Sequence, residues 1–318
     1  MREYFTALQS HLEQQIIGQS ALLERLLITA LTGGHILVEG PPGLAKTTAV
    51  RTLAHSMALH FQRIQFTPDM IPGDITGSDI FIPQEGHFQF IKGPIFHEII
   101  LADEINRAPP KVQSALLEAM EERQVTVGGT TRKLPPVFMV MATQNPIEQE
   151  GTYPLPEAQL DRFLMKFKLT YPTEDHELTI LQQHNQQLRE PATSKIEASL
   201  TPDQLLEVRN KINAIYIDEM LERYIVTLVN ATRTPEQWDD EVSAWIERGA
   251  SPRATLALAH ASRARAYLHG RDFVEPADII DLAYDILNHR ITLSFAARTE
   301  NITCKQAIKR LVEKVPVP

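Results

Sequence analysis

The chain has 318 residues, a length that exceeds one ordinary hydrophobic core and predicts two domains of unequal size. Apolar residues make up 43% of the sequence and charged residues 22%, which excludes a disordered or fibrous protein and indicates a globular one. The net charge of −9 argues against a nucleic-acid partner, because phosphates are bound mainly by clustered Lys and Arg.

The first fifteen residues mix charged and amide side chains, so they lack the apolar stretch of a secretory signal. No later run approaches the roughly 18 apolar residues that a membrane-spanning helix needs. The sequence therefore predicts a cytoplasmic protein without membrane insertion. The single cysteine, Cys304, excludes an internal disulfide and a cysteine-based zinc site.

The first half of the chain has the pattern of an α/β fold. An amphipathic helical region over residues 1–31 is broken at 17–19, and five short apolar runs typical of strands follow at 36–38, 64–66, 99–102, 137–141 and 164–169. Strands that alternate with helices predict a parallel sheet covered on both faces. Three of these strands end at residues suited to ligand binding, namely a glycine at 40, two carboxylates at 103–104 and two amides at 144–145. Because ligands bind at the carboxyl edge of such a sheet, we expect one ligand to contact all three clusters.

A Pro- and Gly-rich segment at about 67–94 is longer than a plain connection and contains a predicted hairpin with strands at 80–82 and 87–91. A second hairpin is predicted at 124–134, with its turn at 128–129. Both hairpins lie within the predicted α/β domain.

The first hairpin carries three aromatic residues, Phe81, Phe88 and Phe90. We expect them to form an exposed patch that binds a protein, because exposed apolar patches on a projecting hairpin commonly mark interaction sites. The alternative is that they pack back on the core.

Strand-like runs end near residue 172, and helical patterns follow at 175–189, 202–232, 252–269, 276–289 and 303–314. The sequence therefore predicts a second domain that is all-helical. We expect an α/β domain at residues 1–190 and a helical domain at 191–318, because residues 190–194 have the composition of a loop.

The segment Gly40-Pro41-Pro42-Gly43-Leu44-Ala45-Lys46-Thr47 follows a predicted strand and precedes a predicted helix, which is the context of a phosphate-binding loop. The prolines have no N–H, so the amides from Gly43 onward are expected to bind phosphate at the positive end of the helix. Lys46 is expected to reach the β- and γ-phosphates, and Thr47 to hold Mg²⁺. The predicted cofactors are ATP and Mg²⁺, and the predicted nucleotide-binding residues extend through Thr48.

Residue 45 departs from the strict loop pattern, which has glycine where this chain has alanine. The extra methyl group of Ala45 would lie close to the phosphates. Alanine is tolerable at this position if its φ angle is negative.

Two adjacent carboxylates, Asp103 and Glu104, follow the apolar run at 99–102. Adjacent residues of a strand point in opposite directions, so the two can take different roles. Asp103 would position Mg²⁺ through its water shell, and Glu104 would orient and deprotonate the attacking water. An acidic pair after a strand also fits a helix cap or a solvated turn, but the phosphate loop earlier in the chain favours catalysis.

Four segments of the sequence resemble motifs of the MoxR family of AAA+ ATPases, both in their order along the chain and in their residues. They are Asp103-Glu104-Ile105-Asn106-Arg107-Ala108, residues 142–146, residues 155–163 and residues 249–254. The hairpin region resembles the helix-2 insert of the clade that this family shares with magnesium chelatase motors and MCM-type helicases. The resemblance extends over about residues 1–300. It implies a P-loop parallel-sheet AAA+ core followed by an all-helical lid.

By this resemblance, Asn145 matches the sensor-1 residue that helps to place water near the γ-phosphate. Arg162 matches the arginine finger, and Arg253 matches sensor 2 of the lid. Ser251 and Pro252 are good N-cap and first-turn residues, so Arg253 would leave from the start of a helix. From the residues alone, Asn145 also fits a turn, and an arginine beside an aspartate also fits a local ion pair.

Ile17 and Gly18 resemble the adenine-side contact of such ATPases, and a plain helix break is the competing interpretation. The resemblance implies an ATP-hydrolysing homo-oligomer, a ring of six, that acts like a chaperone in the maturation or activation of a protein client. Clients of such ATPases often bear a von Willebrand factor A domain. The alternatives are a nucleic-acid motor of MCM type, a metal-chelatase motor, and a nucleotide-switched scaffold with negligible turnover.

Overall fold

The computed structural model describes residues 1–145, 151–189 and 200–318, and by their contacts these form two compact units. The first unit contains Met1 and the described parts of 3–155 and 167–207; the second contains Arg2, 156–166 and 208–318. The predicted domain boundary at residues 190 and 191 lies outside the described residues. The segment 156–166, which the sequence prediction assigns to the first domain, groups with the second unit.

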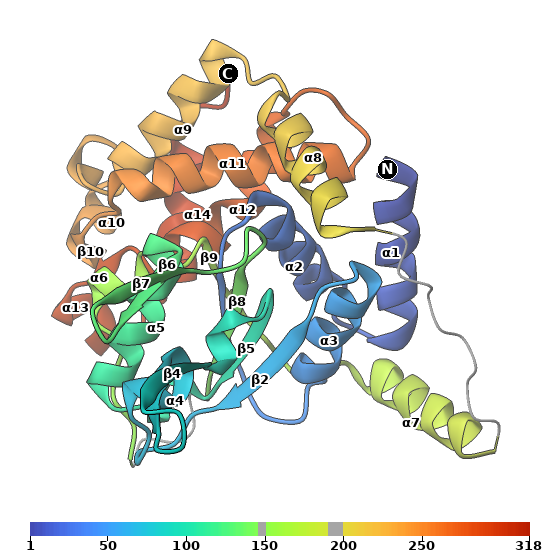
Figure 1. Ribbon diagram of the computed structural model, residues 1–318. Coiled ribbons are helices and arrows are strands. Elements are labelled where there is room, and N and C mark those ends of the chain that lie inside the picture. The colour runs from blue at the N-terminus through green and yellow to red at the C-terminus, as the bar shows by residue number, and fades with distance from the viewer. Residues whose placement is uncertain (146–150, 190–199) are drawn as a thin grey trace. The chain divides into compact units, whose positions relative to one another are not determined.

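The first unit is built on a five-stranded sheet with the strand order β2-β5-β8-β1-β9 (Figure 1). The pairs β2–β5, β5–β8 and β1–β8 are parallel. The strands are β1 (Ile36–Glu39), β2 (Phe61–Gln65), β5 (Ile99–Asp103), β8 (Met139–Gln144) and β9 (Met165–Lys168). The helices are α1 (Arg2–Gln15), α2 (Ser20–Thr32), α3 (Lys46–Ser56), α4 (Pro72–Thr76), α5 (Pro110–Glu122) and α7 (Glu174–Arg189), with short 3-10 turns at Pro94–Phe96 and Ile105–Arg107.

The central strands are buried along their length because helices pack around the sheet (Figure 1). In β5, for example, the residues 99–102 are all buried and only Asp103 is partly exposed. The predicted α/β class with a parallel sheet is confirmed. The outer strands are more polar, as β2 shows with its alternation of half-buried, buried and exposed positions.

Two strands differ in their bounds from the prediction. β2 begins at Phe61, ahead of the predicted Ile64, because as an edge strand it needs only one apolar face. β8 begins at Met139 and continues to Gln144, whereas the apolar run predicts 137–141. Pro135 and Pro136 have no N–H to donate to a neighbouring strand, and the polar end of β8 pairs with β1.

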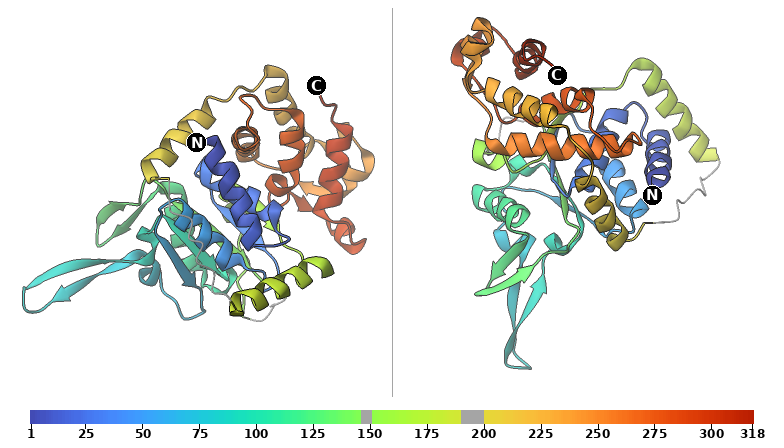
Figure 2. Two further views of the ribbon diagram at one scale, coloured as in Figure 1. Left: turned by 90° about the vertical axis from the view of Figure 1, so that its right-hand side faces the viewer. Right: turned by 90° about the horizontal axis from the view of Figure 1, so that it is seen from above.

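Two antiparallel hairpins leave the sheet at the predicted places, β3 (Gly77–Ile82) with β4 (His87–Lys92), and β6 (Gln124–Val127) with β7 (Thr130–Lys133). Gly128 and Gly129 have φ angles of +57° and +76°, so the second hairpin turns through a pair of residues that glycine suits best. Figure 2 shows the hairpin β3–β4 extending away from the sheet.

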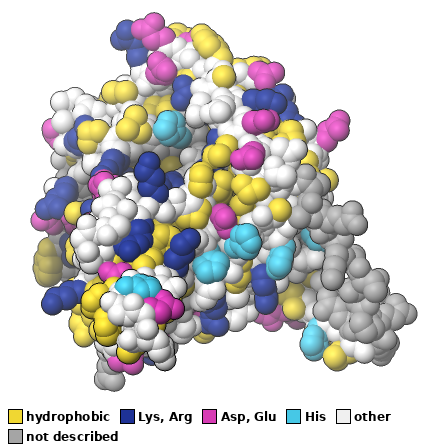
Figure 3. Space-filling model, viewed as in Figure 1, with side chains coloured by type: hydrophobic (Ala, Val, Ile, Leu, Met, Phe, Trp, Pro, Cys, Tyr) yellow, Lys and Arg dark blue, Asp and Glu magenta, His cyan; other side chains and the backbone are white. Residues whose placement is uncertain are grey.

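The aromatic residues of β3–β4 divide between solvent and protein. Phe81 and Phe88 are 49% and 70% exposed, as predicted, and hydrophobic side chains gather around this hairpin at the lower left of Figure 3. The prediction that Phe90 is exposed is wrong. Its ring lies 5.8 Å from that of Phe96, and the guanidinium of Arg132 lies 3.7 Å from its centroid. Phe90 is nearer the base of the hairpin, where the second hairpin covers it.

The second unit consists mainly of helices, as predicted. These are α6 (Glu157–Leu160), α8 (Pro202–Asn213), which begins in the first unit, α9 (Glu219–Ala231), α10 (Asp240–Trp245), α11 (Pro252–Leu268), α12 (Pro276–Leu287), α13 (Phe295–Thr299) and α14 (Cys304–Lys314), with a 3-10 turn at Pro235–Gln237. The expectation of helices alone is corrected by one short antiparallel pair, β10 (Ile246–Arg248) with β11 (Thr292–Leu293).

The predicted helix at 202–232 is two helices. Asp218 ends the connection between α8 and α9, because its side chain accepts a hydrogen bond from the backbone N–H of Met220 at 2.9 Å and caps α9. Of the helices in the described ranges, none is both long and apolar enough to cross a lipid bilayer.

Candidate functional site

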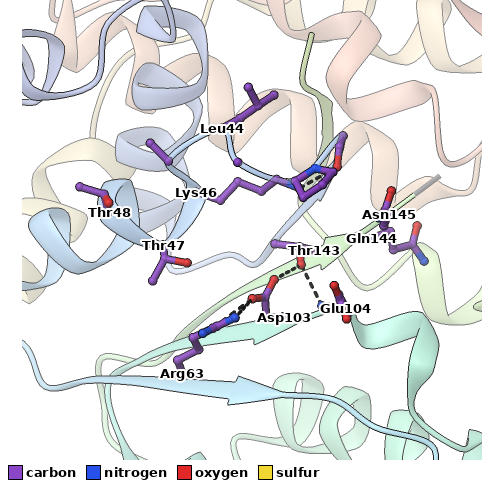
Figure 4. Close-up of a pocket in the computed structure, with 14 residues that line it drawn as sticks. Leu44, Lys46, Thr47, Thr48, Arg63, Asp103, Glu104, Thr143, Gln144 and Asn145 are labelled. Carbon is purple, nitrogen blue, oxygen red and sulfur yellow. Dashed lines mark hydrogen bonds and ion pairs between the residues drawn. The ribbon is translucent and has the colours of Figure 1, made fainter. Parts of the chain in front are cut away.

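The phosphate-loop segment connects β1 to α3 at the carboxyl edge of the sheet (Figure 4). A Cβ atom added to Gly40 would lie 2.6 Å from the Cβ atom of Leu169, so only glycine fits where the loop leaves the strand. Gly43 has a φ angle of +84°. The Lys46 ammonium group turns back over the loop and donates a hydrogen bond to the carbonyl oxygen of Gly40 at 2.7 Å.

Ala45 has a φ angle of +53° and a ψ angle of +20°, which is left-handed backbone. The condition of a negative φ, under which the sequence makes alanine tolerable here, is not met. A left-handed alanine costs about 1 kcal/mol relative to glycine, because its Cβ crowds the following carbonyl oxygen. The loop therefore stores backbone strain at the residue before Lys46.

Replacing Ala45 with glycine should raise the melting temperature of the first unit by about 2–4 °C, since it removes roughly 1 kcal/mol of strain. Differential scanning calorimetry measures this shift. The matched control is Ala58→Gly, because Ala58 is also left-handed, with a φ angle of +49°, and lies beyond the end of α3. Both variants should gain stability, and a loss of stability in Ala45→Gly would contradict the assignment of strain.

Asp103 ends β5, and its carboxylate is held from two sides. Its Oδ1 accepts a hydrogen bond from the Thr143 hydroxyl at 2.6 Å, and its Oδ2 accepts from Nε and Nη2 of Arg63 at 3.0 and 2.6 Å. Figure 4 shows these three side chains converging below the loop. The carboxylate is thereby fixed at the edge of the sheet where the sequence places it.

Glu104 lies beyond the strand, so the expected alternation of two strand residues does not separate it from Asp103. Its φ angle is +58°, and its backbone N–H donates to the Thr143 hydroxyl oxygen at 2.9 Å. Its Oε2 accepts a hydrogen bond from the Gln65 side chain at 2.9 Å and lies 3.4 Å from Nη1 of Arg107. A left-handed turn, in place of the pleat, gives the two carboxylates their different directions.

Burial lowers the pKa of the Lys46 ammonium group, and the Asp103 and Glu104 carboxylates act in the opposite direction. The same three residues line a cavity of about 370 Å³ together with the loop, Arg63 and Thr143–Asn145. Asn145 follows the end of β8. The structure thus brings the three predicted clusters, at the ends of β1, β5 and β8, around one cavity.

A second cavity of about 470 Å³ shares the loop residues 42–45 with the first. It is lined by Ile17 and by residues of the segment 171–184 that sequence reasoning missed, including Tyr171 and Ile180. Glycine is favoured at position 18 because its φ angle is +73°, and a Cβ there would also lie 2.7 Å from Nδ1 of His176.

Three polar residues that bind the acidic pair escaped the sequence analysis, namely Arg63, Gln65 and Thr143. Two of them lie on β2, whose register with β5 places Gln65 opposite Asp103. The sequence signal for Arg63 and Gln65 was the alternation of polar and apolar residues within β2. Polar side chains near the carboxyl end of a neighbouring strand can reach the acidic pair. Thr143 lies within the segment 142–146 and was overlooked beside Asn145.

Arg162 and Arg253 lie in the second unit. As predicted, Ser251 caps α11, because its hydroxyl oxygen accepts a hydrogen bond from the Arg253 backbone N–H at 3.2 Å. Nη1 of Arg253 lies 3.9 Å from Oδ2 of Asp161, the residue before Arg162. The two arginines therefore belong to segments that meet at one carboxylate.

Two protein-family models match the chain. Residues 35–165 match the ATPase family associated with various cellular activities (AAA), and residues 240–311 match the AAA lid domain. The first match contains the phosphate loop and both carboxylates. The second contains α11 and α12 completely, together with Arg290.

Similar proteins cover nearly the whole chain. Chaperone MoxR1 of Mycobacterium tuberculosis is 45% identical over 95% of this chain and 79% of its own length, and the uncharacterized protein YeaC of Bacillus subtilis is 42% identical over 97% and 93%. Protein MoxR of Methylorubrum extorquens is 28% identical over 100% and 96%. A crystal structure of a candidate ATPase from Cytophaga hutchinsonii superposes with a TM-score of 0.92 at 47% identity, covering 100% of this chain and 96% of that one. This chain therefore belongs to the MoxR family of AAA+ ATPases, enzymes that hydrolyse ATP.

Proposed function

We propose that this ATPase assembles into a closed ring of six, hydrolyses ATP at the interfaces between its subunits, and uses the resulting motion in the chaperone-like maturation or activation of a protein client. The observation that carries the proposal is the convergence of Lys46, Asp103, Glu104 and Asn145 on one cavity beside the phosphate loop. A cation, two carboxylates and an amide at this place are the groups that phosphoryl transfer requires.

The two cavities that share residues 42–45 suit the two ends of a nucleotide. The amides from Gly43 onward and the Lys46 ammonium group face phosphate in the first. Ile17, Tyr171 and Ile180 offer apolar surface to an adenine base in the second. We propose that the nucleotide-binding residues are those predicted from sequence, Gly40 through Thr48 with Ile17 and Gly18.

The residues at the first cavity also fit Mg²⁺. Thr47 offers a hydroxyl and Asp103 a carboxylate, and Mg²⁺ prefers such oxygen ligands while it keeps several waters. Bound Mg²⁺ would neutralise charge on the β- and γ-phosphates. Asp103 is already held in place by Thr143 and Arg63, so its orientation does not depend on the metal.

In the proposed mechanism, Glu104 orients the attacking water and accepts its proton, and Asn145 helps to place the same water. Lys46 holds the β- and γ-phosphates. Transition-state charge on the γ-phosphate still needs a cation from the side that the loop leaves open. We propose that Arg162 of a neighbouring subunit supplies that cation and that Arg253 of the lid supplies a second contact.

A protein client is supported by the exposed end of the hairpin β3–β4. Its apolar patch consists of Phe81 and Phe88, which are register partners on one face of the hairpin, have ring centroids 5.2 Å apart and are 49% and 70% exposed. Ile80 and Ile91 are exposed on the opposite face. A patch of this kind on a projecting element marks a binding surface. One relative carries the name of a chaperone, and we propose a client of the kind that bears a von Willebrand factor A domain.

Nucleic acid is a poorer fit to the same hairpins. Their basic residues are Lys92, Arg132 and Lys133, and two of these already have partners. Arg132 lies over the Phe90 ring and 3.5 Å from the Asp79 carboxylate, and Lys92 lies 5.6 Å from the Phe96 centroid. Little of this positive charge is left to follow a phosphate backbone.

The double variant Phe81→Ser/Phe88→Ser should keep the basal ATPase rate, the melting temperature and ring assembly, because both side chains face solvent. The increase in ATPase rate that a client produces should fall at least about ten-fold, because the variant removes the apolar contact with the client. Phosphate release with and without a purified von Willebrand factor A domain protein from the same organism measures this.

Phe90→Ser is the matched control for the hairpin. It should lower the melting temperature, because this ring packs on Phe96 and Arg132. If the double variant instead melts many degrees below the wild type while Phe90→Ser does not, the assignment of the exposed patch is wrong.

A further inference from the structure

Arg290, which follows α12 in the second unit, is almost completely buried, with a side chain 2% exposed. It donates five hydrogen bonds, one for each of its N–H groups. Nε donates to Oδ1 of Asp161 at 2.8 Å, and Nη2 donates to the carbonyl oxygens of Asp161 and Phe163 at 3.2 and 2.7 Å. Nη1 donates to the carbonyl oxygens of Leu164 and Ile286 at 3.1 and 2.6 Å. No donor remains for a phosphate.

These contacts enclose the backbone on both sides of Arg162. The neighbours of Arg290 add two contacts. The Asn288 amide donates a hydrogen bond to the carbonyl oxygen of Lys166 at 2.8 Å, and Nε2 of His289 lies 3.2 Å from the carbonyl oxygen of Phe163. A planar guanidinium can satisfy so many acceptors only when their positions are fixed relative to one another. Arg290 therefore selects one conformation for the segment that carries Arg162.

The Asp161 carboxylate extends the same network to the start of α11. Its Oδ2 accepts a hydrogen bond from the Ser251 hydroxyl at 2.7 Å, and that hydroxyl oxygen also caps α11 at the Arg253 N–H. The Asp161 carboxylate thus binds two partners. Its Oδ1 binds Arg290, and its Oδ2 binds Ser251, the cap of the helix that carries Arg253.

We infer that Asp161 and Arg290 form a positioning pair that holds Arg162 and the start of α11, with Arg253, as one rigid element, so that the rate of hydrolysis depends on a buried arginine that does not itself reach the nucleotide. The inference rests on the proposed roles of Arg162 and Arg253. A buried ion pair is often replaceable by apolar residues without loss of stability, and its best-attested benefit is a unique local structure. Here the pair fixes the local structure that orients Arg162 and Arg253.

The test is Arg290→Lys, which keeps the charge and one bond to Asp161 but loses the planar fork. We expect kcat for ATP to fall at least ten-fold with KM within about two-fold of the wild type. The matched control is Arg271→Lys. Arg271 also makes two bonds, both at 2.7 Å, to a buried aspartate of the second unit, Asp278, and contacts neither arginine segment. Arg271→Lys should lower the melting temperature and leave kcat unchanged.

A double-mutant cycle separates positioning from a general loss of structure. In a background that carries both Arg162→Ala and Arg253→Ala, Arg290→Lys should lower kcat by less than about two-fold further, because the two residues through which it acts are absent. Asp161→Asn, which keeps the side-chain volume, should show the same pattern and serves if Arg290→Lys does not fold. Wild-type kcat in both variants, or a reduction that multiplies in full with that of the Arg162→Ala/Arg253→Ala background, would overturn the inference. Wild-type rates in Arg162→Ala and Arg253→Ala would instead show that the proposed roles of those arginines are wrong.

Discussion

Glu104→Gln should lower ATP turnover by at least about 100-fold while leaving ATP affinity within a few-fold of the wild type, because it removes the proton acceptor and keeps its size. The carboxylate is placed by the left-handed turn after β5 and by the Gln65 amide, and a glutamine can keep both features. Steady-state phosphate release gives the turnover, and titration with a fluorescent ATP analogue gives the affinity.

Two further variants define what this result means. Glu98→Gln is the matched control, since Glu98 precedes the same strand and its carboxylate binds His60 at 2.9 Å, away from the cavity. It should hydrolyse ATP at the wild-type rate. Lys46→Ala should weaken ATP binding itself, because Lys46 is the cation at the phosphate loop. Wild-type turnover by Glu104→Gln would contradict the role of Glu104 and assign the proton acceptor to another group.

Arg162→Ala should lower turnover by about 1,000-fold or more and leave ATP binding by a single subunit unchanged. The reason is that an arginine supplied to the γ-phosphate acts on charge that develops only in the transition state. Phosphate release and nucleotide titration measure the two effects separately.

The control for Arg162→Ala is Arg223→Ala, an arginine on the exposed face of α9 that pairs with Glu219 at 2.7 Å. Surface pairs of this kind contribute little, so this variant should keep wild-type turnover and stability. A drop of less than about two-fold in Arg162→Ala would remove this residue from the mechanism.

The sequence predicts the chemistry of the site better than its geometry. Lys46, Asp103, Glu104 and Asn145 follow apolar strands, and the rule that ligands bind at the carboxyl edge of a parallel sheet brings them together without coordinates. The left-handed conformations of Ala45 and Glu104 could not be predicted, because neither residue type favours a positive φ angle and only the surrounding contacts impose it.

Contacts between distant segments were the other missing information. Arg63 reaches Asp103 only through the register of β2 with β5, and Phe90 is covered only because the second hairpin folds beside the first. Arg290 gives no motif at all, yet it binds the segment of Arg162 from more than a hundred residues away. Local patterns do not encode which segments meet in the folded chain.

Mixing Lys46→Ala and Arg162→Ala subunits tests hydrolysis across a subunit interface most directly. Each variant alone should be nearly inactive, the first because it cannot hold ATP and the second because it lacks the cation for its neighbour. When subunits exchange, some interfaces pair an intact Lys46 site with an intact Arg162, so turnover should recover and peak near equal amounts. Formation of mixed rings is checked by native mass spectrometry. Mixed rings that stay as inactive as their components would contradict catalysis in trans and the assembly-dependent function proposed for this protein.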